Sequence, residues 1–349
     1  MFLGIEIGGT KLQLGVGPGN GGPLVELARR DIDARRGAEG ILSQIQEAAS
    51  ELLSRHIVTR IGIGFGGPVD SATGRVLKSH QVAGWDDAPL GEWCQTNLGV
   101  PAVLANDCDA AALAEARFGA GRGARTVFYV TVGTGIGGGL VIDGRVHGVG
   151  RPAVAEIGHL RPGLHADRPE DTIESMASGP GIAATAQALL SGQVSRSLPK
   201  IRRQMGRPDR AHFRERLERV VAGAQTHRDD LLRRCGNDLE SLNARHVAQA
   251  AGEGNELARE VLDEASQALG WAIAQVVTLV APEIVVVGGG VSLMSESLFM
   301  APVRRHALKY VFPPLASAYE ILPAQLGEEV VVHGALAIAS AMGNATPYL

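Results

Sequence analysis

Two glycine-rich turns are the stretches of this sequence best suited to binding phosphate. Gly8-Gly9-Thr10-Lys11 separates two apolar runs, and Gly133-Thr134-Gly135 opens the glycine-rich stretch that runs to Leu140. Glycine leaves backbone N–H groups uncovered, and successive uncovered N–H groups form nests that bind anions. Two such hairpins that faced each other across a cleft would hold one polyphosphate from both sides.

The second turn also matches the letters of a dinucleotide-binding fingerprint, at Gly133-x-Gly135-x-x-Gly138. That fingerprint requires a helix that begins at the glycines, so that its N-terminus faces the pyrophosphate. Here an apolar run at 140–142 and Asp143-Gly144, a two-residue hairpin signal, follow the glycines instead. We therefore interpret the stretch as a strand, a glycine turn and a returning strand.

Asn106 and Asp107 stand where a predicted strand becomes an alanine-rich helix. Ligands of open α/β sheets collect at the carboxyl ends of parallel strands, which makes Asp107 a candidate acceptor for a hydroxyl proton. A structural explanation is also available, because Asn is a good N-cap and Asp favours the first helical turn. The two interpretations are compatible, since a helix N-terminus would keep Asp107 ionised.

Glu156-x-x-His159 and Glu174 follow the second hairpin. Acceptor groups close to a phosphate nest suit a polyhydroxylated substrate. Surface glutamates and a hydrogen-bonded histidine are the alternative, and the spacing is not that of a zinc-binding His-Glu-x-x-His helix.

The composition indicates an ordinary soluble enzyme of two domains. The 349 residues are 45% hydrophobic and 20% charged, and a net charge of −4 gives no general reason to bind nucleic acid or a membrane. The arginine-rich segment 191–240 is interrupted by acids such as Glu215 and Asp229. This mixture favours a solvated helical insertion or an oligomer contact over a nucleic-acid patch.

The cysteines and apolar runs predict a cytoplasmic protein without a membrane span. The three cysteines are widely spaced: Cys94, Cys108 and Cys235. This spacing fits neither a disulfide framework nor a cysteine zinc site. Glu6 and Lys11 interrupt any signal-peptide core, and Pro282 and Glu283 divide the longest apolar stretch, 271–291.

Strands and helices alternate in a way that would position these residues in an α/β fold. Apolar runs predict strands at 2–7, 12–16, 24–31, 60–65, 102–105, 125–132, 140–142 and 284–287. Helical spacing predicts helices at 38–55, 90–97, 108–118, 179–190, 255–281 and 335–342. The strand–turn–strand opening occurs twice, so we expect two similar halves.

In their order along the chain, these motifs resemble the ROK family (repressor, open reading frame, kinase) of bacterial sugar kinases and regulators. The matching stretches are 4–11, 64–69, 106–115, 131–150, 156–159, 174–180 and 287–292. They cover nearly the whole chain apart from 191–240.

The resemblance implies an actin-like ATPase fold, in which two ribonuclease-H-like α/β domains close over ATP–Mg²⁺ and a sugar. It places residues 1–118 and 325–349 in the N-terminal domain and residues 119–324 in the larger C-terminal domain. The last helix would return to pack on the N-terminal domain.

The resemblance also implies roles for individual residues. Asp107 corresponds to the general base, and the implied sugar ligands are Gly67, Asn106, Asp107, Glu156, His159 and Glu174. The implied nucleotide ligands are Gly8, Gly9, Thr10 and Lys11 in the first turn, Gly133, Thr134 and Gly135 in the second, and Gly289 and Gly290 beside the base or ribose. Such a site needs positioning, Mg²⁺ and a carboxylate, and little covalent chemistry from the protein.

Two departures from the family pattern concern metals. The usual zinc site combines the His of Glu-x-Gly-His with three loop cysteines, but residues 160–173 contain none, so we expect no structural zinc. His165 and Asp167 are the alternative ligands there. The family's first-turn Asp is Glu6 in this chain; this longer carboxylate is expected near Mg²⁺, as in some sugar kinases of the family.

These residues together predict an ATP-dependent hexose kinase, glucokinase-like, acting as a homodimer or homotetramer. The alternatives are an N-acetylhexosamine or fructose kinase, or a non-catalytic protein that binds sugar or nucleotide, which Glu6 and the missing zinc loop suggest. A transcriptional regulator is disfavoured, because regulators of the family carry a helix-turn-helix before the first glycine turn.

Overall fold

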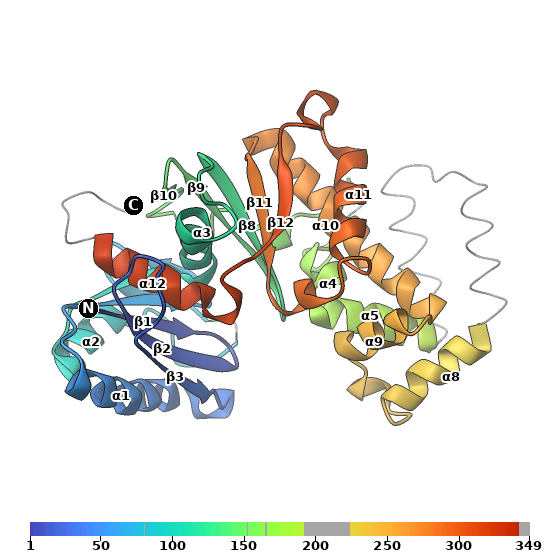
Figure 1. Cartoon of the computed structure of the whole chain (residues 1–349). Coiled ribbons are helices and arrows are strands. Elements are labelled where there is room, and N and C mark those ends of the chain that lie inside the picture. The colour runs from blue at the N-terminus through green and yellow to red at the C-terminus, as the bar shows by residue number, and fades with distance from the viewer. Residues whose placement is uncertain (80, 152, 165, 192–223, 342–349) are drawn as a thin grey trace.

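The computed structural model describes residues 1–79, 81–151, 153–164, 166–191 and 224–341, and two five-stranded sheets dominate it (Figure 1). The first sheet contains β1 (Phe2–Ile7), β2 (Lys11–Gly17), β3 (Glu26–Asp31), β4 (Arg60–Phe65) and β7 (Ala102–Asn106). The second contains β8 (Thr126–Val132), β9 (Ile136–Ile142), β10 (Arg145–Val146), β11 (Ile284–Gly288) and β12 (Glu320–Pro323). A separate small hairpin is formed by β5 (Val69–Asp70) and β6 (Arg75–Val76).

Helices cover both faces of each sheet. They are α1 (Gly37–Arg55), α2 (Leu90–Leu98), α3 (Asp107–Phe118), α4 (Glu174–Ala177), α5 (Gly179–Leu190), α8 (Ala224–Arg234), α9 (Ala244–Gly252), α10 (Glu256–Val280), α11 (Met300–Tyr310) and α12 (Val330–Ala341). Short 3₁₀ turns are η1 (Ala34–Arg36), η2 (Ile157–His159), η3 (Leu239–Ser241), η4 (Gly290–Leu293), η5 (Pro313–Leu315) and η6 (Gly327–Glu329).

The two sheets have the same topology. Their strand orders are β3-β2-β1-β4-β7 and β10-β9-β8-β11-β12. In each sheet three antiparallel strands are followed by two that pair in parallel. The predicted α/β fold with two similar halves is therefore confirmed.

Alternating residues in β1 and β4 give the first sheet one bulky face and one glycine face. Leu3 and Ile63 point into the core shared with α1 and α2. Gly4 and Gly62 point the other way, where α12 lies across the sheet (Figure 1). A Cβ on Gly62 would lie 1.8 Å from the carbonyl oxygen of Ala335, so α12 rests directly on the sheet backbone.

The second sheet is buried on both faces by the same alternation. Phe128 and Val130 of β8 pack into the core formed with α10 and its neighbouring helices. Val127 and Tyr129 point to the opposite face and pack with α3 and α12. Helices α3 and α12 therefore form a layer that is shared by the two sheets.

Helix α3 lies between α12 and β9 with almost no side chain separating the backbones. A Cβ on Gly334 of α12 would lie 1.9 Å from the carbonyl oxygen of Ala110. On the other side, a Cβ on Gly139 of β9 would lie 2.6 Å from the carbonyl oxygen of Cys108. The alanine-rich sequence of α3 is thus explained by close packing on two faces.

The structure corrects two sequence predictions. The returning strand β9 begins at Ile136 instead of 140, because Gly137 and Gly139 are strand residues that admit α3 and are not part of the turn. Helix α12 begins at Val330 instead of 335, since packing on the first sheet outweighs the strand preference of three successive valines.

The arginine-rich insertion is only partly described. The arginines between 202 and 219 lie outside the described residues, so the prediction of a solvated helical pair or an oligomer contact remains open for them. In α8, Arg234 pairs with Asp230 and Glu253. Within the described ranges, no helix is both long enough and apolar enough to cross a bilayer.

The tight packing of α3 predicts a large cost for one added methyl group. We expect Gly334→Ala to lower the free energy of unfolding by about 1–3 kcal/mol, because the backbones of α12 and α3 must separate. Gly252→Ala is the matched control, since the added Cβ would meet only Leu298 at 3.9 Å. Urea unfolding measures both, and equal midpoints for the two variants would contradict this packing.

Candidate active site

Asn106 joins the first sheet to the start of α3. Its side-chain oxygen caps the helix by accepting from the N–H groups of Cys108 (2.8 Å) and Asp109 (3.4 Å). Its amide nitrogen donates to the carbonyl oxygen of Gly67 at 3.1 Å. Asn106 therefore fixes both the helix N-terminus and the neighbouring glycine turn after β4, where Gly67 lies.

Asp107 is the first residue of α3 and is half-buried. Burial raises its pKa from 3.8 to about 6; the N–H of Cys108 opposes the rise, and the carboxylates of Glu6 and Glu156 add to it. The helix N-terminus acts in the expected direction, but burial outweighs it. At neutral pH the carboxylate is mainly ionised and titrates close enough to neutrality to accept a proton efficiently.

A cavity of about 340 Å³ lies where the two sheets meet. Predicted site residues that line it are Glu6, Lys11, Asp107, Gly289 and Gly290. Gly289 must be glycine, because its φ is 88° and a Cβ would lie 2.5 Å from the carbonyl oxygen of Val132. Gly290 next to it has open space where a Cβ would stand.

Glu6 is held at the wall of this larger cavity by two side chains of β2. Lys11 Nζ lies 3.3 Å from one carboxylate oxygen, and Gln13 Nε2 donates to the other at 2.7 Å. Gln13 is completely buried, and both Lys11 and Gln13 also donate to the carbonyl oxygen of Glu328. Burial raises the pKa of Glu6, partly offset by Lys11 and Gln13.

The carboxylates of this cavity fit a magnesium ion that arrives with a nucleotide. Glu6 offers hard oxygen ligands in the cavity that Asp107 also lines, and Mg²⁺ sites in phosphate-binding enzymes use one or two carboxylates with phosphate and water oxygens. Their mutual repulsion, which raises the pKa of Asp107, is the kind of strain that a bound cation relieves.

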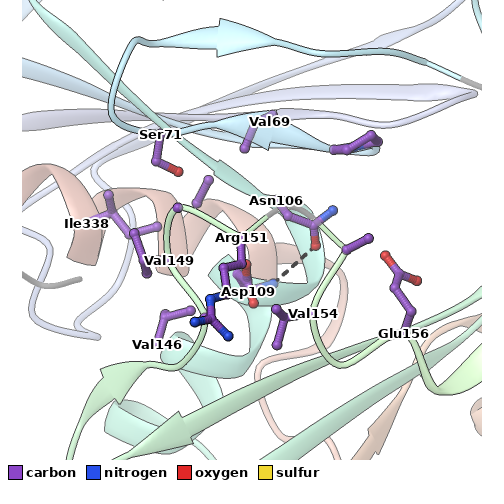
Figure 2. A pocket seen from close by; sticks show the side chains of 15 residues that line it. Val69, Ser71, Asn106, Asp109, Val146, Val149, Arg151, Val154, Glu156 and Ile338 are labelled. Carbon is purple, nitrogen blue, oxygen red and sulfur yellow. Dashed lines mark hydrogen bonds between the residues drawn. The ribbon is translucent and has the colours of Figure 1, made fainter.

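A smaller pocket of about 40 Å³ lies on the other side of the α3 N-terminus (Figure 2). Asn106, Asp109 and Glu156 line it, together with the loop that contains Val149 and Val154. Burial, with repulsion from Asp107 and Glu156, raises the pKa of Asp109 to about 7. This smaller pocket is rich in hydrogen-bond acceptors, as a ligand with several hydroxyl groups requires.

The other sequence-predicted sugar ligands lie outside the linings of both cavities. The His159 side chain is largely exposed, and its Nδ1 lies 3.8 Å from Glu156 Oε2. One oxygen of Glu174 accepts from the N–H of Ile136 at 2.8 Å, which fastens the short α4 to the second glycine turn.

Each glycine turn uses one of its N–H groups internally. The N–H of Gly8 donates to the carbonyl of Lys11 (3.0 Å), and that of Gly133 donates to the carbonyl of Gly135 (2.9 Å). Gly9 lies against the side chain of Gln81, and the carbonyl of Thr10 accepts from Ile32. In the described part of the chain, no acceptor is bonded to the N–H of Thr134 or Gly135.

The expectation about zinc stays a prediction. His165 lies outside the described residues. Among the residues that the structure describes, no group of three or more His, Cys, Asp or Glu side chains is arranged to hold a metal ion.

Gln13 and Asp109 are further residues of the site that were not predicted from the sequence. Gln13 stands opposite Glu6 in the antiparallel register of β1 and β2, so the predicted hairpin already contained the signal. Asp109 lies in the first turn of α3, where an acid also has a structural explanation, so its residue type alone is a weak signal of function.

The comparison with known families defines the class of protein. The model of the ROK family matches residues 2–342, and the chain belongs to this family. Glucokinase from Thermotoga maritima is 29% identical over 338 residues, which are 97% of this chain and 96% of that protein.

Solved structures agree with this assignment. The ROK family glucokinase from Streptomyces griseus, solved in complex with glucose and AMPPNP, is 28% identical, with a TM-score of 0.76 over 97% of this chain and 99% of that one. The ROK hexokinase from Thermus thermophilus is 26% identical, with a TM-score of 0.70 over 99% of both chains. The fold is the actin-like ATPase fold.

The raised pKa of Asp107 predicts that an uncharged residue there stabilises the protein. The folded carboxyl titrates at about 6 and an ordinary one at 3.8, so the folded state loses stability as the pH rises through this window. Asp107→Asn should therefore raise the melting temperature at pH 8 and leave it unchanged at pH 3. The gain in the free energy of unfolding at pH 8 should be at most about 3 kcal/mol.

The exposed Asp86→Asn is the control for this measurement, made by calorimetry at both pH values. A melting temperature of Asp107→Asn that fell at pH 8 would contradict the electrostatic account of the site.

Proposed function

We propose that this ROK protein, an ATP-dependent sugar kinase, phosphorylates a hexose hydroxyl with Asp107 as the general base and yields a sugar 6-phosphate. The main support for the proposal is the position of the N-terminus of α3. Asp107 lines the larger cavity, and the adjacent Asn106 lines the acceptor-rich smaller pocket. One carboxylate thus stands between a space for a nucleotide and a pocket whose polar lining suits the hydroxyl groups of a polyol.

In this mechanism the Asp107 carboxylate accepts the proton of the sugar hydroxyl. The hydroxyl oxygen then bonds to the γ-phosphorus of ATP while the bond from that phosphorus to the bridging oxygen breaks, and ADP leaves. Glu6 would help to hold a Mg²⁺ ion that binds with ATP, and that ion would supply positive charge to the phosphate oxygens. The N–H groups of the glycine turns that are not used within the turns, together with Lys11, hold the phosphates, and Gly289 and Gly290 let the nucleoside approach the backbone.

The sugar is held on the opposite side of α3. Glu156 offers acceptors for its hydroxyl groups, and Asp109 is a further candidate in the same pocket. Asn106 caps the helix with its oxygen and donates one amide N–H to Gly67, so its second amide N–H is the group that a sugar oxygen would accept. His159 and Glu174 would contribute after closure of the N-terminal domain (1–118 and 325–349) onto the C-terminal domain (119–324). Closure excludes water and so suppresses hydrolysis of ATP.

A coupled assay with ATP–Mg²⁺ and a panel of hexoses and 2-acetamido hexoses tests the function. We expect turnover with glucose or a close hexose. Turnover only with an N-acetylhexosamine or fructose would reassign the substrate, and sugar binding without phosphorylation would identify a non-catalytic protein. Glucose is the favoured substrate, because the similar proteins from Thermotoga maritima and Streptomyces griseus are named glucokinases.

Removing the base should affect the chemical step and leave binding intact. We expect Asp107→Asn to lower kcat by about two to four orders of magnitude, because the hydroxyl loses its proton acceptor. The dissociation constant for ADP should change little. An unchanged kcat would exclude Asp107 from this role.

The pH profile gives a separate test of the same carboxylate. Since the pKa of Asp107 is raised to about 6, kcat/KM of the wild-type protein should fall as the pH drops below about 6. A profile that stayed flat down to pH 4.5 would show that an ordinary carboxylate, or none, limits the rate.

A further inference from the structure

Glu115 is a buried carboxylate on α3 that plays no part in the mechanism above. It is completely buried, yet its two oxygens accept three backbone N–H groups. Oε2 accepts from Ala120 at 2.8 Å, and Oε1 accepts from Gln325 and Leu326 at 2.9 Å each. Gly119 makes room for it, because a Cβ there would lie 2.0 Å from Oε2.

The three donors lie on the two segments that connect the halves of the chain. Ala120 belongs to the segment between α3 and β8, and Gln325 and Leu326 belong to the return from β12 to α12. Both segments also contain a glycine with positive φ and open space around it, Gly123 and Gly327. Glu115 thus fastens both connecting segments to one point on α3.

The return segment continues directly into the wall of the larger cavity. Gly327 and Glu328 line this cavity. The carbonyl oxygen of Glu328 accepts from Gln13 at 2.8 Å and from Lys11 at 3.3 Å. Since Gln13 and Lys11 hold Glu6, a chain of hydrogen bonds runs from Glu115 through the return segment to the Glu6 carboxylate.

We propose that Glu115 is a positioning residue for the nucleotide, acting through residues 325–328 on Lys11, Gln13 and Glu6. This inference rests on the proposed function. It requires a carboxylate, because three N–H donors converge on two acceptor oxygens. A glutamine would offer one oxygen and turn an NH₂ group towards a backbone N–H, which leaves a buried donor unpaired.

The proposal predicts a selective effect on the two substrates. The residues of the smaller pocket, such as Asn106 and Glu156, are not on the segment that Glu115 holds. Loosening residues 325–328 should therefore weaken the binding of nucleotide and leave the binding of sugar almost unchanged. A purely structural role would lower stability without this difference.

The test is Glu115→Gln, with the KM values for ATP and for the hexose and the dissociation constant for ADP–Mg²⁺ by calorimetry. We expect the KM for ATP and the ADP constant to rise about tenfold and the hexose KM to change less than about twofold. Gln187→Leu is the matched control: it removes donations to the carbonyls of Leu239 (2.8 Å) and Leu242 (3.3 Å) far from both connecting segments.

An unchanged ADP constant in folded Glu115→Gln, or the same rise in the control, would overturn the proposal. If Glu115→Gln does not fold, Gly119→Ala takes its place, because the added methyl group would displace the Glu115 carboxylate without removing it. An unchanged dissociation constant for ADP in this variant, or the same rise in the control, would then overturn the proposal. ADP binding needs no turnover, so a wild-type protein that binds ADP without phosphorylating any sugar would refute the proposed function and still test Glu115.

Discussion

The close packing of α3 between α12 and β9 is the constraint on which the site depends. Gly334 and Gly139 bring the neighbouring backbones against the helix on both sides, so no flexible side chain separates α3 from α12 or β9 at these two contacts. Any rotation or slide of α3 would cause backbone clashes. Asp107, at the end of this helix, is therefore fixed at the meeting line of the two sheets, with the larger cavity beside it.

The same position creates an electrostatic cost. Glu6, Asp107, Asp109 and Glu156 gather where the sheets meet, and burial with mutual repulsion raises the pKa values of Asp107 and Asp109. Lys11 and Gln13 offset part of this cost at Glu6. A site that concentrates carboxylates in this way is less stable when empty than when a cation-bearing substrate is bound. The protein thus gives up stability to hold two carboxyl groups, Asp107 and Asp109, that titrate near neutrality.

Much of this arrangement could be predicted from the sequence, because local patterns determine it. The strand at 60–65 and the helix at 179–190 have the predicted bounds, since alternation and capping by Ser178 are local signals. The pairing of Glu6 with Gln13 was accessible from the hairpin register. The strand positions of the β9 glycines and the three N–H donors to Glu115 could not be predicted from the sequence, because they depend on contacts between residues that are distant in the sequence.

A crystal structure of the protein with a hexose and a non-hydrolysable ATP analogue tests the central claim most directly. The account predicts a sugar hydroxyl within hydrogen-bonding distance of the Asp107 carboxylate, with the terminal phosphate of the analogue on the other side of that hydroxyl. A sugar bound away from the N-terminus of α3, or an Asp107 carboxylate turned away from it, would contradict the account.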